Sequence, residues 1–252
     1  MNLNEKFLRT IEVSLQKFLI SDPRSNEKLK PLHGGIKSDL FNKIQQLNIK
    51  NINLISLDNT NSSEDIIHGR YYDKTVDISI RKDNIIIGGV GVKFVMNNYK
   101  QNANNYFENM LGETANIRSA GIPYFQMLIL FEKMPYFKKG GILSKWEEIS
   151  LNTHLKKYIK LSHDNIERFY HTPILTLLSI VSLPQEITED DTIIDKNTFN
   201  EKLLMLINSN KLKLNYSSKF SSDIFSDNVI LNNYEVFLDR LVHYFLYLGK
   251  FN

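Results

Sequence analysis

The sequence predicts an α/β fold in which a mixed sheet is flanked by helices. Two apolar segments rich in β-branched residues, 76–80 and 85–95, are separated by the polar turn 81–84, and this pattern is typical of a strand hairpin. Apolar residues then recur at helical spacing over 101–118, and the apolar run 124–131 has the length of a further buried strand. A hairpin, a helix and a strand in this order predict a sheet with a helix packed on it.

Further helices are expected on either side of this core. Residues 5–20 carry apolar side chains at helical intervals, and residues 30–40, which include a Gly-Gly pair, are predicted as a loop leading into a second helix that ends near Leu47. Later helical patterns cover 146–162, 199–208 and 231–248, whereas the apolar run 173–183 fits either a helix or a strand. We therefore predict one domain over residues 1–252, composed of N-terminal helices (1–65), a core (66–135) and a mostly helical C-terminal elaboration (136–252).

Composition excludes several classes of function. The chain has no cysteine, so it has no disulfide, no thiol catalysis and no cysteine-ligated metal. No apolar run approaches the roughly 18 residues of a membrane span, and no signal peptide is recognisable, so we expect a cytoplasmic protein without a membrane segment. The net charge of +3 does not demand a nucleic acid partner. A cluster of lysines could contact a phosphate backbone or form a solvated surface, and it comprises Lys133, Lys138, Lys139, Lys145, Lys156, Lys157 and Lys160.

Histidines and glycines form no recognisable motif. The six histidines show neither an HExxH nor an HxH arrangement, so a histidine-containing metal site is not predicted. Gly88, Gly89 and Gly91 lie in a strand and match neither a phosphate loop nor a dinucleotide fingerprint. We interpret them as small residues that let a ligand approach the strand closely.

Two charged residues stand out in the predicted hairpin. Asp77 lies in the first apolar segment and Lys93 in the second. Burying an unpaired ion costs several kcal/mol. Asp77 and Lys93 are therefore expected either to pair with each other or to face a polar site, such as one that holds a metal ion.

The spacing of Asp77 and Lys93, with the strands and helix around them, resembles that of the PD-(D/E)xK nuclease superfamily, to which most type II restriction endonucleases belong. The resemblance extends over residues 66–135 and implies a restriction-endonuclease-like fold with this segment as the catalytic core. It implies Mg²⁺-dependent hydrolysis of double-stranded DNA, with Asp77 as a metal ligand and Lys93 in contact with the attacking water and the scissile phosphate. Since such enzymes cut two strands symmetrically, it also implies a homodimer, for which the first and last helices are candidate interfaces.

Gly91 departs from the pattern of this superfamily, because the second metal-binding acid is expected at its position. Some restriction endonucleases of the superfamily carry that acid on the helix after the lysine strand, where this chain has Glu108 and Glu113. At about 100° per residue, Glu113 borders the apolar face of the helix, whereas the spacing in the relocated-acid enzymes favours Glu108. Both therefore remain candidate catalytic residues and Mg²⁺ ligands. The rival hypothesis is a non-catalytic DNA-binding protein on the same fold, in which Gly91 marks an activity that was lost or was removed by engineering.

Overall fold

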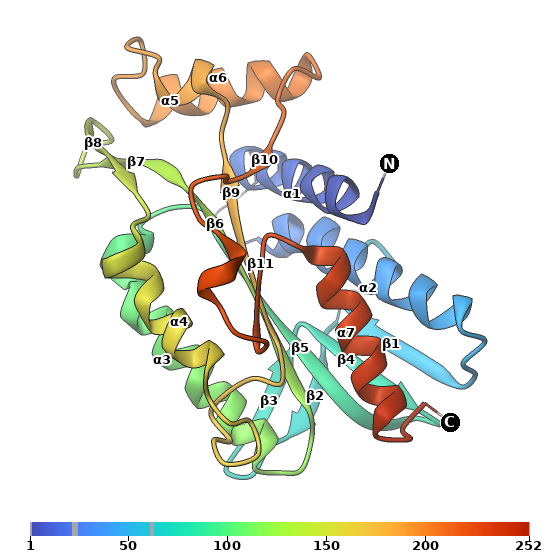
Figure 1. The fold of residues 1–252 in the computed structure, drawn as a ribbon. Coiled ribbons are helices and arrows are strands. Elements are labelled where there is room, and N and C mark those ends of the chain that lie inside the picture. The colour runs from blue at the N-terminus through green and yellow to red at the C-terminus, as the bar shows by residue number, and fades with distance from the viewer. Residues whose placement is uncertain (1, 22–24, 61–62, 252) are drawn as a thin grey trace.

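The computed structural model describes residues 2–21, 25–60 and 63–251, and over these residues the chain is an α/β protein (Figure 1). Its main sheet has seven strands in the order β1-β4-β5-β6-β9-β10, with β11 also paired to β9. The predicted mixed sheet flanked by helices is therefore confirmed. The strands are β1 (Ile52–Ser56), β4 (Ile78–Lys82), β5 (Ile85–Val95), β6 (Tyr124–Phe131), β9 (Thr176–Ser182), β10 (Asn215–Tyr216) and β11 (Val229–Leu231).

The pairing of the strands changes from antiparallel to parallel across the sheet. Strands β1, β4 and β5 are antiparallel neighbours, whereas β5, β6, β9 and β11 run parallel. Asp83 and Asn84 form the tight turn between β4 and β5 with positive φ angles of 48° and 66°, a conformation that Asp and Asn tolerate well. Helix α3 (Tyr99–Arg118) makes the crossover from β5 to β6, as parallel pairing requires.

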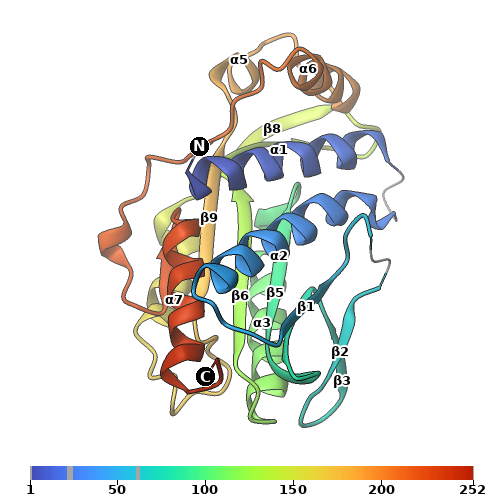
Figure 2. The ribbon, with the colours of Figure 1, turned by 90° about the vertical axis from the view of Figure 1, so that its right-hand side faces the viewer.

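Helices cover both faces of this sheet. Helices α1 (Leu3–Ile20), α2 (Leu29–Gln46) and α7 (Tyr234–Tyr247) lie on one face, and α3 with α4 (Lys156–Ser162) lies on the other (Figures 1 and 2). Helices α5 (Gln185–Thr188) and α6 (Lys196–Asn208) lie at one end of the sheet, beyond α1. Short helical turns complete the chain at η1 (Asn26–Lys28), η2 (Leu151–Leu155) and η3 (Ser222–Ile224).

The predicted loop over 30–40 is instead the first half of helix α2, so that prediction is wrong. A Cβ atom at Gly34 would lie 2.8 Å from Cβ of Asp58, and one at Gly35 would lie 2.8 Å from Cγ2 of Thr10 in α1. The two glycines therefore let α2 pack closely against α1 and the segment after β1. This gain from packing outweighs the low helix propensity of glycine.

Residues 133–182 contain more strand than the sequence predicts. Strands β7 (Lys133–Phe137) and β8 (Leu143–Glu148) form a hairpin, so the predicted helix over 146–162 is confirmed only in its second part. The ambiguous run 173–183 contains β9, which is almost entirely buried between β6 and β11. A strand covered on both faces reads as a continuous apolar run, without the alternation that identifies a half-exposed strand. The C-terminal part is therefore not only a helical elaboration, because it supplies β9, β10 and β11 to the main sheet.

The apolar faces of the first and last helices are used inside the chain. In α1, Phe7 and Ile11 are at most 1% exposed, and in α7 so are Phe237, Leu241 and Phe245. Those faces therefore cannot also form a dimer interface. Within the described residues, no helix has the length and hydropathy that crossing a membrane requires.

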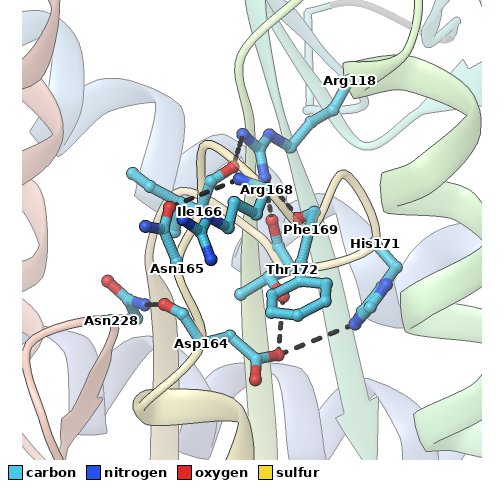
Figure 3. Close-up of polar contacts among 9 residues, drawn as sticks. All are labelled: Arg118, Asp164, Asn165, Ile166, Arg168, Phe169, His171, Thr172 and Asn228. Atoms are coloured by element: carbon cyan, nitrogen blue, oxygen red, sulfur yellow. Dashed lines mark hydrogen bonds and ion pairs between the residues drawn. The ribbon is translucent and has the colours of Figure 1, made fainter.

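A buried arginine at the end of α3 fixes the loop between α4 and β9 (Figure 3). Nη2 of Arg118 donates to the carbonyl of Ile166 at 2.6 Å, and Nη1 donates to the carbonyls of Phe169 and Thr172. The hydroxyl of Thr172 donates in turn to Oδ2 of Asp164 at 2.8 Å. Because its donors are taken up by backbone carbonyls, we assign Arg118 to loop anchoring.

Candidate functional site

The four residues predicted as catalytic line one pocket of about 370 Å³ between α3 and the sheet. Side chains on β5 alternate between the two faces: Val92 and Phe94 belong to the core under α2 and α7, whereas Gly91 and Lys93 line the pocket. Asp77 lies in the bend immediately before β4, one residue outside the strand in which the sequence analysis places it, and Glu108 and Glu113 extend from α3. The structure therefore brings Asp77, Lys93, Glu108 and Glu113 together, as the sequence analysis expected.

Asp77 is held at the floor of this pocket. Its Oδ2 atom accepts a hydrogen bond of 2.6 Å from the backbone N–H of Val92 on the neighbouring strand. Desolvation raises the pKa of this carboxyl to about 6, although His33 and the Val92 N–H act in the opposite direction. The negative charges of Glu64 and Glu113 contribute to this rise. Without a cation beside it, the charged form of Asp77 is thus less favourable than that of a free aspartate, even though 29% of the side chain is exposed.

Two residues that the sequence analysis did not select lie against Asp77. Nε2 of His33, on α2, is 3.8 Å from Oδ1 of Asp77, and Nδ1 of the same ring is 3.4 Å from Oε1 of Glu64. One ligand atom of each of the three residues lies within 4.8 Å of the other two. His33 is fully buried, and neither ring nitrogen has a hydrogen-bond partner among the residues that the structure describes. One nitrogen of this unpartnered ring and one oxygen of each carboxylate form a donor set that suits a divalent metal ion.

No motif in the sequence could have revealed this cluster. His33 falls in the segment predicted as a loop, and Glu64 precedes β2 (Asp65–His68) in a polar stretch. They meet only because α2 packs against the segment that connects β1 to β2. The prediction of a site without histidine is therefore not supported by the geometry.

Glu113 is fixed by two partners. Its Oε2 lies 2.7 Å from Nζ of Lys74, and its Oε1 accepts a hydrogen bond from the hydroxyl of Tyr124. Burial disfavours the charge on Lys74, but the hydrogen bond and charge of Glu113 outweigh this effect and raise the pKa of Lys74. Burial also raises the pKa of Tyr124, and the charge of Glu113 adds to that shift. Glu113 therefore presents an ordered carboxylate to the pocket, whereas Glu108 is exposed on the rim.

Lys93 does not pair with Asp77. Its ammonium lies 5.1 Å from the ring centroid of Tyr106, and the side chain is exposed in the pocket. Across the described parts of the chain, no carboxylate lies within the 4.0 Å of an ion pair with it. Because its charge is not neutralised by a neighbour, Lys93 can bind an anionic ligand.

The space beside Gly91 is filled by side chains from the next strand. A Cβ atom at this position would lie 2.7 Å from Oε1 of Gln126 and 2.8 Å from the hydroxyl of Tyr124. Similarly, a Cβ at Gly88 would meet Phe245 at 2.4 Å, and one at Gly89 would meet Ile67 at 2.8 Å. These glycines therefore serve internal packing, and the interpretation that they admit a ligand is not supported.

The predicted lysine cluster lies on separate elements. Lys133 and Lys145 belong to the β7–β8 hairpin, where their ammonium groups lie over the rings of Trp146 and Tyr136. Lys157 is on α4 and lies over Phe107 of α3. Several of these lysines are therefore engaged with aromatic rings instead of forming one free basic surface.

Comparisons of this chain with protein-family models, with curated proteins and with solved structures gave no match.

Proposed function

We propose that this protein is a metal-dependent endonuclease that hydrolyses double-stranded DNA, and that it acts as a type II restriction endonuclease. The observation that carries the proposal is the pocket in which Asp77, Lys93 and Glu113 meet at the β4–β5 hairpin and α3. The order of elements adds support, because α2, β1, β4, β5, α3 and β6 include the hairpin, helix and strand of the superfamily that the sequence resembles. A cation-accepting carboxylate beside an unpaired lysine suits the hydrolysis of a phosphodiester.

The residues that would hold the metal are Asp77, His33 and Glu64. The unpartnered imidazole of His33, which can offer one nitrogen to a metal, and the raised pKa of Asp77 both fit a bound cation. We propose Mg²⁺ as the natural ion, although imidazole is a ligand that Mn²⁺ and other transition metals accept more readily. Such an ion, when bound, neutralises charge on the phosphate and lowers the pKa of its water.

The other polar residues of the pocket have distinct roles in this proposal. Lys93 binds a non-bridging oxygen of the scissile phosphate and stabilises the negative charge that grows there during attack. Glu113 orients the attacking water through its carboxylate, which Lys74 and Tyr124 hold in place. Glu108, on the rim, is the alternative source of this carboxylate.

Cleavage of mixed-sequence plasmid DNA tests the proposal. We expect the purified protein to cut at one short sequence with Mg²⁺ or Mn²⁺, as sequencing of the ends would reveal. Lys93→Ala should abolish cleavage and leave DNA binding largely intact, because its charge matters most in the transition state. Lys139→Ala, at an exposed lysine outside the pocket, is the matched control and should cut normally. Equal loss of binding and cleavage in Lys93→Ala would point to a structural lysine.

A non-catalytic DNA-binding protein is the second candidate, and Gly91 is the observation in its favour. Gln126 and Tyr124 fill the space where the superfamily has its second acid. Sequence-specific binding without cleavage under any divalent ion would select this alternative, and absence of binding would overturn both.

Symmetric cleavage of two strands requires a homodimer in this proposal. Its interface must use surfaces other than the apolar faces of α1 and α7, which are buried inside the chain. Sedimentation with and without DNA measures the oligomeric state, and a monomer in both conditions would exclude the dimer.

A further inference from the structure

The turn between β2 and β3 (Asp73–Val76) is fixed to the end of α3 by four hydrogen bonds. The backbone N–H of Tyr71 donates to Oδ1 of Asn116 at 2.9 Å, and that of Tyr72 donates to the same atom at 3.4 Å. Nδ2 of Asn116 donates to the carbonyl of Tyr72 at 2.9 Å, and the N–H of Arg70 donates to the carbonyl of Asn116 at 2.9 Å. Because Asn116 is only 2% exposed, these bonds are shielded from water and hold the turn in one conformation.

Gly69 is required for this arrangement. A Cβ atom at this residue would lie 2.1 Å from Nδ2 of Asn116, so any other residue would push the turn away from α3. His68 and Asp73 close the hairpin beside the turn, with 2.8 Å between Nδ1 and Oδ1. The conformation of the turn is therefore specified by several residues at once.

This rigid turn presents large aromatic side chains to solvent. Tyr71 is 77% exposed and Tyr72 is 52% exposed. Arg70 is exposed as well, and its guanidinium carbon lies 5.7 Å from the ring centroid of Tyr71. Exposed aromatic rings on a fixed backbone lose little conformational entropy on binding, and this favours a recognition surface over a mobile loop.

The turn also adjoins the candidate site. Tyr72 and Lys74 line the same pocket as Asp77, Lys93 and Glu113. A nucleic acid strand with one phosphate in that pocket would place its neighbouring nucleotides along the rim. Aromatic rings interleaved with basic groups are the combination that binds bases and backbone of such a strand.

We infer that the turn at residues 69–72 is a base-stacking platform for the nucleic acid strand whose phosphate occupies the pocket. Tyr71 stacks on a base that is unpaired or lifted out of the helix, Tyr72 borders the adjacent sugar, and Arg70 contacts a flanking phosphate. This inference rests on the proposed function, and it deepens that function by naming a distorted or single-stranded segment as the form of DNA that is bound.

Binding measurements without cleavage test the platform. Fluorescence anisotropy in EDTA would compare an oligonucleotide duplex carrying one unpaired 2-aminopurine with a fully paired duplex. We expect Tyr71→Ala to weaken binding of the first duplex about tenfold. Tyr71→Phe keeps the ring and should bind like the wild type. Tyr247→Ala is the matched control, because Tyr247 is 88% exposed on α7 and does not line the pocket.

Two further readouts separate stacking from charge. Stacking on Tyr71 should quench the fluorescence of 2-aminopurine in the wild type and in Tyr71→Phe, but not in Tyr71→Ala. Arg70→Gln should reduce the slope of log affinity against log salt by about one, whereas Tyr71→Ala should leave it unchanged.

Wild-type affinity and quenching in Tyr71→Ala would overturn the platform while leaving the endonuclease proposal in place. Failure of the wild type to bind or cut any DNA would overturn both. A change in Tyr71→Ala from dimer to monomer with unaltered DNA affinity would also overturn it, since the tyrosines would then bind a second copy of the chain.

Discussion

Substitution of Gly91 tests whether the structure can accept the acid that the superfamily pattern expects there. An added Cβ would lie 2.7 Å from Oε1 of Gln126, about 0.7 Å inside ordinary van der Waals contact, and 2.8 Å from the hydroxyl of Tyr124. The side chain of Gln126 lines the pocket and can turn its amide into that space, whereas Tyr124 is fully buried and cannot move into solvent. Displacing the ring of Tyr124 also breaks its hydrogen bond to Glu113.

The expected cost follows from these contacts. Overpacking a buried site costs about 1–3 kcal/mol, and loss of a hydrogen bond to a charged group costs about 1.5–3 kcal/mol. Replacing glycine in a strand returns roughly 0.5–1 kcal/mol of conformational entropy. If Tyr124 moves only in part, Gly91→Ala should lower the free energy of unfolding by about 2 kcal/mol, which corresponds to a fall in Tm of roughly 4–8 °C. Gly91→Glu should cost more, because it adds a further charge next to Asp77 and Glu113.

Thermal and urea unfolding, followed by circular dichroism, measure this effect. Gly112→Ala provides the control, because Gly112 is in α3 beside the same pocket and a Cβ there meets nothing within 4 Å. That variant should be stabilised by up to about 1 kcal/mol, as expected for glycine to alanine within a helix. A Gly91→Ala protein as stable as the wild type would refute the packing argument. A gain of Mg²⁺-dependent cleavage in Gly91→Glu would show that the site accepts the acid and had been disabled.

Three further outcomes are expected. His33→Ala should reduce Mn²⁺ affinity in calorimetry by 10-fold or more, whereas His163→Ala, at an exposed position, should not, and equal affinities would remove His33 from the ligand set. Because the pKa of Asp77 is raised from 3.8 to about 6, the stability that its protonated form contributes is lost as the pH rises through 6. The free energy of unfolding of metal-free Asp77→Asn, measured relative to that of the wild type, should therefore be higher at pH 7.5 than at pH 4.5, by up to about 2 kcal/mol. The same relative value at both pH values would contradict the raised pKa. Glu113→Gln should eliminate cleavage without unfolding the protein and Glu108→Gln should not, so full activity in both would exclude α3 as the source of the carboxylate that orients the attacking water.

The local part of the fold could be predicted from the sequence. The β4–β5 hairpin, α3 and β6 have clear periodicity, and their order alone brings Asp77, Lys93 and Glu113 to the same face. Helical spacing also separated Glu113, on the border of the apolar face, from the exposed Glu108. These predictions succeeded because each depended on residues close together in the chain.

The remaining errors have tertiary causes. The Gly-Gly pair at 34–35 resembles a turn in sequence, but the close packing of α2 against Thr10 and Asp58 requires glycine in a helix. The sequence does not predict strand β8, because Trp146 fits the start of the helical pattern over 146–162. His33 and Glu64 have no motif in common, and only the position of α2 beside the segment before β2 makes them neighbours.

The charges around Asp77 indicate which carboxylates remain available to a metal. Lys74 neutralises Glu113 through a contact of 2.7 Å, and the hydroxyl of Tyr124 takes up its other oxygen. Glu64, by contrast, has His33 at 3.4 Å without a hydrogen bond, and Asp77, whose pKa is raised, lies 3.8 Å from the other nitrogen of the same ring. When the imidazole is neutral, nothing within this cluster compensates the negative charges of its two carboxylates. A divalent ion bound there compensates them. We therefore expect Glu64, more than either glutamate of α3, to supply the carboxylate that Gly91 lacks.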